Sequence, residues 1–271
     1  MKNDDFGDRM KAYEKNDATK LKYGMPVCAR IDGRGFSRFT KGFEKPFDAD
    51  IMGAMQETCR QLVKDTHALI GYVQSDEITL IWEPQIDSQM LFDGKVQKLT
   101  SVMAGIATSA FTFEMLDRTD PDLVRKRRPV FDCRVWNVPN RSEAANVILW
   151  RAQDAARNAI SSACRAVASS KEMHGLDQNS MKSLMDARGI NFNSNYTSIE
   201  KYGALFKRIT RERPFTAKER QKMEAVGLSA PLTLKRSTVE LMKIGYFGNW
   251  NAEDRVQMVF DNSGSVIYID T

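Results

Sequence analysis

The residues best suited to chemistry in this sequence are two groups of carboxylates, one of them inside a glycine-containing loop. The segment ARIDGRGFSRF (29–39) places Asp32 directly before Gly33, and QSDE (74–77) holds Asp76 and Glu77. Carboxylate oxygens are preferred ligands of Mg²⁺. Two such ions would stabilise the attacking and leaving oxygens in phosphoryl or nucleotidyl transfer. The backbone can approach closely at Gly33, so its carbonyl is a further candidate ligand. The arginines of the loop can neutralise phosphate: Arg30, Arg34 and Arg38.

The rest of the composition narrows the kind of site. The chain has only two histidines, so a metal site with three histidine ligands is excluded. The loop is not a Walker phosphate loop, because GxxxxGK[ST] is absent, and it lacks the third glycine of a dinucleotide fingerprint. Four separated cysteines without a CxxC pair argue against a zinc ribbon and favour a reducing cytosol. We expect that no apolar run in the sequence approaches the roughly 18 residues of a membrane span. We therefore expect a cytoplasmic chain without a membrane partner.

The elements that must position these acids follow from hydrophobic periodicity. A strand is expected at 25–31, continuing to Asp32, and Asp48 or Asp50 should cap a helix that follows. Two strands are expected around a tight turn at Ser75-Asp76-Glu77, followed by a helix at 89–115 and a strand at 128–139. Helices at 142–168, 177–188 and 218–226 come next, and alternation around 261–264 predicts a C-terminal β-hairpin.

This order predicts an α+β fold. The series β-α-β-β-α-β is typical of a ferredoxin-like, split βαβ domain, as in the palm of polymerases and nucleotide cyclases. We assign residues 1–140 to this catalytic core and 141–271 to a helical and C-terminal extension packed on it. The first strand and the following hairpin are neighbours in such a sheet, so Asp32 should meet Asp76 and Glu77. Either motif alone also fits an ordinary turn.

Basic residues are concentrated in two places. Positions 201–222 contain eight Lys/Arg and two Glu, a net +6 in a chain whose total is +5, and 125–128 reads RKRR. Such clusters can neutralise a phosphate backbone; the alternative is a solvated face. On this pattern we expect contacts to RNA phosphate from Lys207, Arg208, Arg211 and Arg213.

Several motifs together resemble the tRNA-His guanylyltransferase family, and in particular its bacterial-type guanylyltransferase-like proteins. They are RIDGRGF, FEKPFD (43–48), QSDE, FDCRV (131–135), WRAQDAARNAI (150–160) and MKSLMDARGINFN (181–193). The resemblance covers about residues 23–208. It implies a homotetrameric enzyme with two Mg²⁺ ions that extends tRNA 5′ ends in the 3′-to-5′ direction. ATP adenylylates the 5′-monophosphate, and the 3′-hydroxyl of GTP or another nucleoside triphosphate then attacks.

The resemblance also implies roles for individual residues. Asp32 and Asp76 would hold the metal ions together with the Gly33 carbonyl, and Glu77 would be the third acid of the catalytic site. The nucleotide would lie against the loop after Asp32 and against basic and hydroxyl residues elsewhere. These nucleotide-binding positions are Arg30, Gly33, Arg34, Gly35, Phe36, Ser37, Lys45, Ser75, Lys95 and Lys98.

Two departures from the family pattern bear on the substrate. Ser37 stands where the family often has histidine. Ala155–Ala163 reads AARNAISSA where enzymes specific for tRNA-His have a HINNLYN-like segment, of which only Asn158 remains as a tRNA contact. This favours template-dependent repair of 5′-truncated tRNAs over addition of a guanosine at position −1. Two other classes stay open: a palm-type cyclase acting on GTP or ATP without RNA, and a non-catalytic tRNA-binding protein.

Overall fold

The computed structural model describes residues 5–16, 19–84, 90–229, 233–242 and 245–263. The strands of the described chain are β1 (Val27–Gly33), β2 (Ile70–Gln74), β3 (Glu77–Trp82), β4 (Phe131–Asn137), β5 (Ala204–Pro214) and β6 (Thr233–Leu241). The helices of the first half are α1 (Asp5–Asn16), α2 (Phe36–Phe39), α3 (Ala49–Thr66), the 3₁₀ turn η1 (Leu91–Gly94), α4 (Val96–Arg118) and α5 (Pro121–Arg127). Those of the second half are α6 (Arg141–Val167), α7 (Ser170–Met173), α8 (Gln178–Asp186), α9 (Phe192–Asn195), α10 (Ser198–Tyr202), α11 (Ala217–Ala225) and α12 (Ala252–Phe260).

One six-stranded sheet organises the chain. Its order is β4-β1-β3-β2-β5-β6, and every neighbouring pair is antiparallel. The first four strands, with α3 between β1 and β2 and α4 between β3 and β4, form two interlocked split βαβ units. The predicted α+β class and the order β-α-β-β-α-β are therefore confirmed.

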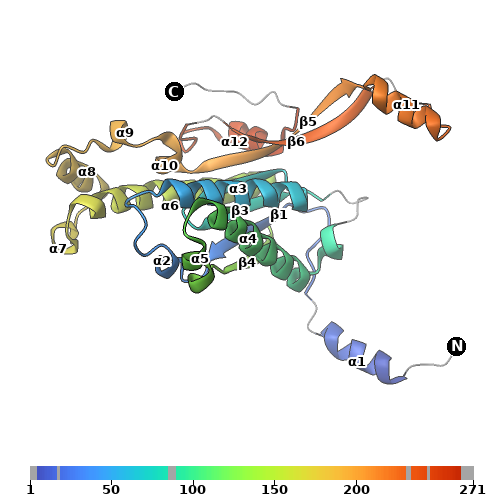
Figure 1. The fold of residues 1–271 in the computed structure, drawn as a ribbon, viewed down its shortest axis with the longest axis horizontal. Helices are drawn as coiled ribbons and strands as arrows, with labels where there is room; N and C mark the ends of the chain where they lie inside the picture. Colours follow the sequence, from blue (N-terminus) through green and yellow to red (C-terminus); the bar gives the residue numbers. More distant parts are fainter. Residues whose placement is uncertain (1–4, 17–18, 85–89, 230–232, 243–244, 264–271) are drawn as a thin grey trace.

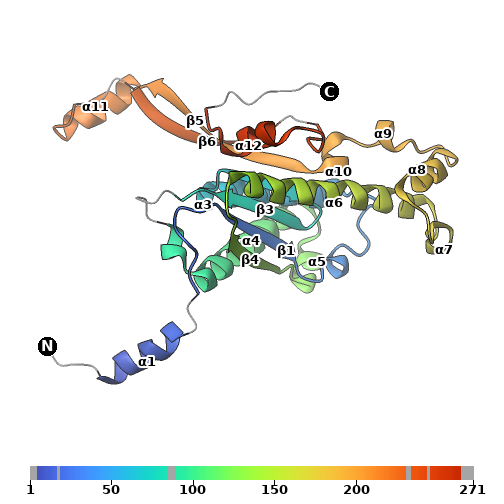
Figure 2. The same cartoon turned by 180° about the vertical axis from the view of Figure 1, so that it is seen from behind.

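The sheet is covered on both faces, as Figures 1 and 2 show from opposite sides. On one face α3 and α4 contribute residues such as Leu62 and Phe111 to a core cluster that includes Ile31 of β1. On the other face α6 and α12 pack against Cys28 and Ile81. Side chains alternate between the faces of a strand. Since Cys28 lies on the α6 face, the side chains of Arg30 and Asp32 lie on that face too.

The C-terminal third extends the sheet instead of closing it. β5 and β6 pair over nine residues and project beyond the other strands as a two-stranded arm that carries α11 (Figure 1). The sequence predicts a β-hairpin around 261–264, but the residues expected to form its first strand, 252–260, form α12 instead. The residues expected to form its second strand, 264–271, lie outside the described residues. α12 begins after Asn251, whose side-chain oxygen caps the helix by accepting a hydrogen bond from the backbone N–H of Asp254 at 2.9 Å. The division after residue 140 stays a prediction.

Helix α4 differs from its prediction in two ways. It begins at Val96 instead of residue 89, because Phe92, Asp93 and Gly94 all have positive φ and break the helix. By length and composition, α4 is also the one described helix that could cross a membrane. The expectation that no segment approaches the length of a membrane span was therefore wrong. Its stripe Leu99, Met103, Ala107, Phe111 and Met115 packs into the core against α3 and the sheet.

Candidate active site

A cavity of about 460 Å³ opens at the end of β1 where the first carboxylate lies. It is bounded by the β2–β3 turn, by α2 and the loop after it, and by α6. Eight of the residues predicted for the catalytic, nucleotide or tRNA site line it: Asp32, Phe36, Ser37, Lys45, Ser75, Asp76, Glu77 and Asn158. Sequence positions from 32 to 158 thus meet at one place.

Asp32 and Asp76 are brought together by strand register. Asp32 pairs with Glu77 across β1 and β3, and the N–H of Gly33 donates to the carbonyl of Asp76 at 3.0 Å. A side chain at position 33 would place its Cβ 3.0 Å from the Cβ of Asp76 and 2.5 Å from the Phe36 ring. The close approach therefore requires glycine. The tight turn is completed by Ser75 at φ 52°, whose hydroxyl donates to Asp76 at 3.1 Å.

The environment of Asp76 destabilises its ionised carboxylate. Burial, and to a smaller extent the nearby charge of Asp32, raises the pKa of Asp76 above its ordinary value. A divalent cation between the two carboxylates would relieve both effects.

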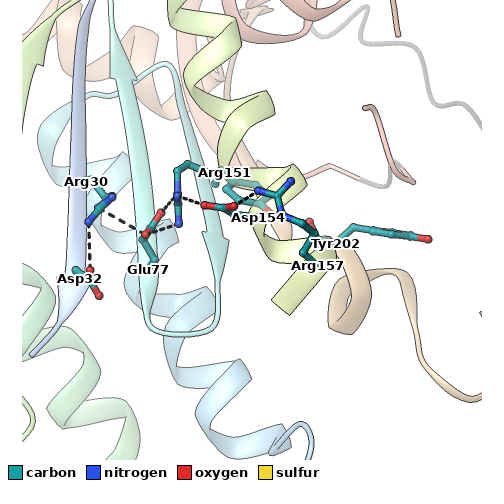
Figure 3. Close-up of polar contacts among 8 residues, drawn as sticks. Arg30, Asp32, Glu77, Arg151, Asp154, Arg157 and Tyr202 are labelled. Carbon is teal, nitrogen blue, oxygen red and sulfur yellow. Dashed lines mark hydrogen bonds and ion pairs between the residues drawn. The ribbon is translucent and has the colours of Figure 1, made fainter. Parts of the chain in front are cut away.

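Glu77 has a different role from the other two acids. Both of its carboxylate oxygens accept hydrogen bonds from Arg151 on α6, with the Nη2–Oε2 bond at 2.8 Å. Arg30 approaches the same carboxylate, with Nε 3.5 Å from Oε2, and its Nη2 lies 3.6 Å from an oxygen of Asp32. Burial raises the pKa of Glu77, while the two arginines act in the opposite direction. Figure 3 shows this chain of ion pairs, which continues from Arg151 to Asp154 and Arg157.

Glu77 therefore lines the cavity, whereas Arg30 does not line it and lies behind the two acids. Contact of Arg30 with phosphate stays a prediction. No group of three or more His, Cys, Asp or Glu residues in the described ranges has the geometry of a metal site. A metal ion here would rely on Asp32, Asp76, the Gly33 carbonyl and oxygens of the substrate.

The remaining walls carry polar and basic groups. Lys45 lies in the loop before α3, which is held by Asp48: one carboxylate oxygen caps α3 by accepting from Ile51 N, and the other accepts from Glu44 N, each at 3.0 Å. Asp48 is thus confirmed as the predicted cap. On α6, Asn158 faces the cavity together with Ser161, Ser162 and Arg165.

The sequence reasoning missed Arg151, Asp154 and Arg165. Arg151 lies within the motif WRAQD, and the Arg151–Asp154 spacing of i, i+3 is that of a helical ion pair. An arginine on a helix otherwise rich in alanine is a signal that could have been used. Its partner Glu77 could not be identified, because it lies 74 residues earlier.

Lys95 and Lys98 are not at this site. They flank the start of α4, where Leu21 N donates to Gly94 O at 2.9 Å, and Lys98 Nζ lies 5.1 Å from the Phe92 ring centre. This is the Val27 end of β1, five residues from Asp32, which corresponds to roughly 17 Å along a strand. Neither lysine lines the catalytic cavity, and their contact with the triphosphate stays a prediction.

Two of the predicted RNA contacts are structural residues instead. Lys207 is 0% exposed, and its Nζ donates to the carbonyls of Met258 and Val259 at the end of α12. Arg208 donates to the carbonyls of Val63, Lys64 and Ala68 at the end of α3. Basic groups at helix C-termini satisfy the last carbonyls. The predicted contact of Lys207 with tRNA is therefore contradicted, whereas that of the partly exposed Arg208 stays a prediction.

The other two predicted RNA contacts lie on the arm and are paired with carboxylates. Arg211 forms an ion pair with Glu240 across the β5–β6 ribbon, and Arg213 forms one with Glu219 on α11. Glu240 lies outside positions 201–222, so its pair with Arg211 neutralises part of the +6 counted there, whereas Glu219 is already included in that count. Contact of either arginine with tRNA stays a prediction.

Arg34 and Gly35 do not line the catalytic cavity. Gly35, at φ 60°, lets the chain turn into α2, and both residues face the opposite side of that turn. Their predicted contact with the nucleotide is not supported.

Comparisons with known proteins point to one family. Residues 7–139 match the family described as tRNAHis guanylyltransferase. A protein of Acanthamoeba polyphaga mimivirus is 30% identical over 227 residues, covering 76% of this chain and 78% of that protein. The tRNA(His) guanylyltransferase of Schizosaccharomyces pombe is 32% identical over 148 residues, 54% of each chain.

Solved structures give the same result. A bacterial tRNA(His) guanylyltransferase (Thg1)-like protein in complex with ATP is similar at a TM-score of 0.70 and 37% identity, covering 74% of this chain and 88% of that one. A structure of such a bacterial protein in complex with GTP is similar at a TM-score of 0.68 and 29% identity, covering 94% and 99%.

Proposed function

This chain belongs to the tRNA(His) guanylyltransferase family of nucleotidyltransferases, and on that premise we propose that it is an Mg²⁺-dependent enzyme extending tRNA 5′ ends. The observation that carries the proposal is the meeting of Asp32 and Asp76 across Gly33 at the mouth of a cavity large enough for a nucleotide. The polymerase palm, which also uses split βαβ units and paired carboxylates, is the nearest analogy.

The residues present fit the implied metal. Asp32, Asp76 and the carbonyl of Gly33 are hard oxygen donors. Burial and the charge of Asp32 raise the pKa of Asp76, and a bound cation would offset both. Bound Mg²⁺ would supply charge neutralisation at the reacting phosphate oxygens. Glu77 acts as a positioning residue, since both its oxygens are held by Arg151.

The nucleotide contacts are provided by Lys45, Ser37 and Ser75 on one side and by Arg165 on the other. In the first step, an oxygen of the tRNA 5′-phosphate attacks the α-phosphorus of ATP and pyrophosphate leaves. In the second, the 3′-hydroxyl of the incoming nucleoside triphosphate attacks that 5′-phosphorus, and AMP leaves. The bacterial structures in complex with ATP and with GTP support both nucleotides as substrates.

Within the family we propose template-dependent repair of 5′-truncated tRNAs. The wall of the cavity formed by α6 presents Asn158, Ser161 and Ser162 and contains neither histidine nor an aromatic side chain among its α6 residues. Such a wall has no aromatic surface on which to stack a base. The incoming nucleotide would then be selected by pairing with the 3′ side of the acceptor stem, while the protein contacts backbone and shape. The runner-up is addition of a guanosine at position −1. We also propose the homotetramer expected for the family.

Primer-extension analysis with labelled nucleotides tests this proposal. Wild-type protein, Mg²⁺, ATP and a tRNA lacking its first nucleotide should give a product one residue longer, and a compensatory change in the 3′ strand should change the added base. Asp76→Asn should abolish the product. Asp117→Asn, on the exposed surface of α4, is the matched control.

Three outcomes would redirect the proposal. Guanosine addition to tRNA-His alone would favour the runner-up. A product formed from GTP or ATP without RNA would favour a cyclase. RNA binding without incorporation of any nucleotide would favour a non-catalytic binding protein.

A further inference from the structure

A second cavity, of about 300 Å³, lies on the other side of the α2 turn and is lined by four arginines. We call it the arginine cavity. Arg34 and Arg38 come from the loop after Asp32, and Arg127 and Arg128 come from the end of α5. Two basic segments separated by about 90 residues in sequence therefore converge on one hollow. None of the four arginines lines the catalytic cavity.

The backbone around the arginine cavity is held by defined contacts. Arg34 N donates to Val130 O at 2.8 Å, which ties the end of β1 to the chain entering β4. Arg127 Nη1 donates to the carbonyl of Phe39, and its guanidinium lies 5.8 Å from the Phe43 ring centre. Arg128 has left-handed backbone angles, φ 49° and ψ 76°, and its N–H bonds Val124 O at 2.9 Å. The arginines are positioned by the fold and do not belong to a loose tail.

The charge of the arginine cavity is not neutralised by the protein. Its lining contains no carboxylate, and among the described residues no Asp or Glu forms an ion pair with any of the four guanidinium groups. Arginine cannot lose its proton in a protein. The four positive charges therefore give the cavity a positive potential that attracts an anion. Elsewhere in the chain Arg151, Arg211 and Arg213 have carboxylate partners.

The chemistry of the lining selects phosphate. Guanidinium groups bind phosphate oxygens through two parallel N–H donors. The other members of the lining are Gly35, Pro129, Val130 and two phenylalanines that are less than 10% exposed. No Asn, Gln, Ser or Thr side chain lines the cavity to read the edge of a base, and the phenylalanine faces are covered. The cavity is suited to a phosphodiester and not to a whole nucleotide.

We propose that the arginine cavity binds backbone phosphate of the RNA strand close to its reacting 5′ end. The catalytic and arginine cavities share Phe36 in their linings, so a strand leaving the first can enter the second within a short distance. The exposed Lys126 continues the basic surface beyond the cavity, as a polymer requires and a free phosphate does not, whereas the neighbouring Arg125 is paired with Asp122. The identity of the anion as RNA rests on the proposed function.

Salt-dependent binding measurements test the inference. Anisotropy of a fluorescently labelled tRNA lacking its first nucleotide is measured over a range of KCl concentrations, without ATP or GTP, for wild type, Arg38→Gln, Arg128→Gln and the double variant. The slope of log K against log[KCl] should become shallower by about 0.7–0.9 for each phosphate that a variant no longer neutralises. Arg60→Gln, an exposed arginine paired with Glu57 on α3, should leave the slope unchanged.

Calorimetric titration with Mg·ATP separates RNA from a free nucleotide as the source of the phosphate. Affinity for ATP should be equal in wild type and in both single variants. An unchanged salt slope in both Arg38→Gln and Arg128→Gln overturns the inference. Loss of ATP affinity with an unchanged slope overturns it in favour of a nucleotide site.

The proposed function can fail separately from the inference. If the wild type incorporates no nucleotide while the two arginines still govern the salt slope, the site binds RNA in a protein that is not a polymerase. Thermal unfolding of each variant confirms that it is folded. If Arg128→Gln does not fold, Arg38→Gln decides the result alone.

Discussion

Replacing Lys207 by methionine distinguishes a lysine that stabilises the fold from one that binds RNA. The ammonium group is 0% exposed and donates to two carbonyls at the end of α12. Burial lowers the pKa of Lys207 to about 7, with a smaller opposing effect of Asp261. The ordinary lysine pKa is about 10.4. Between these two values the unfolded chain binds more protons than the folded one, so folding stability rises with pH in that window.

The size of this effect follows from the two pKa values. Raising the pH from 7 to 8 should stabilise wild type through this group by about 1 kcal/mol, and the step from 8 to 9 by about 1.3 kcal/mol. Buried thiols act in the opposite direction: burial raises the pKa of Cys28 and of Cys133 to about 12, so the folded state loses stability above their ordinary pKa. These thiols are the same in wild type and Lys207→Met. Subtracting the two profiles therefore isolates Lys207.

Urea unfolding at pH 7, 8 and 9 measures the difference between wild type and Lys207→Met. Lys207→Arg provides a contrast, because a guanidinium group stays charged and should destabilise the fold at every pH. Salt-dependent tRNA binding of folded Lys207→Met should match wild type. A stability difference that does not change with pH, or a salt slope shallower by about one unit in Lys207→Met, would refute the structural role.

Three further predictions concern the catalytic cavity and its surroundings. Asp76→Asn should abolish nucleotide incorporation. Without divalent cations it should raise Tm at pH 7, because an ionised carboxylate no longer has to be held beside Asp32. Since folding raises the pKa of Asp76, thermal scans should show this gain in Tm disappearing as the pH falls towards about 4. Arg151→Met should cost about 3 kcal/mol in urea unfolding by leaving Glu77 without its bidentate partner, and Arg151→Lys should recover only part of that loss. Lys98→Ala should leave the KM for ATP within twofold of wild type in the incorporation assay, since this lysine is at the far end of β1; a large increase in KM would mean that another copy of the chain supplies it to the site.

The strands of the core could be predicted because each one is short, apolar and bounded by clear signals. The turn at Ser75–Asp76 and the cap at Asp48 are local features, set by residues within four positions of one another. The start of α4 was misjudged because three consecutive residues with positive φ interrupt an apolar pattern that looks continuous. The β5–β6 arm was missed because its charged residues suggested a solvated segment, and nothing local indicates that β5 pairs with β2, more than 130 residues earlier.

The sequence by itself determined the split βαβ order, the two carboxylates that we propose as metal ligands, and the family. Each of these depends on residue type and on spacing along the chain. The tertiary structure alone decided which charges are available to a substrate. Lys207 and Arg208 contact helix ends, and Arg30 lies behind the acids of the site. Arg34 and Arg38 line a hollow shared with Arg127 and Arg128. The physical reason is that a charge is free or satisfied according to its neighbours in space. Those neighbours come from strands and helices that are distant in sequence.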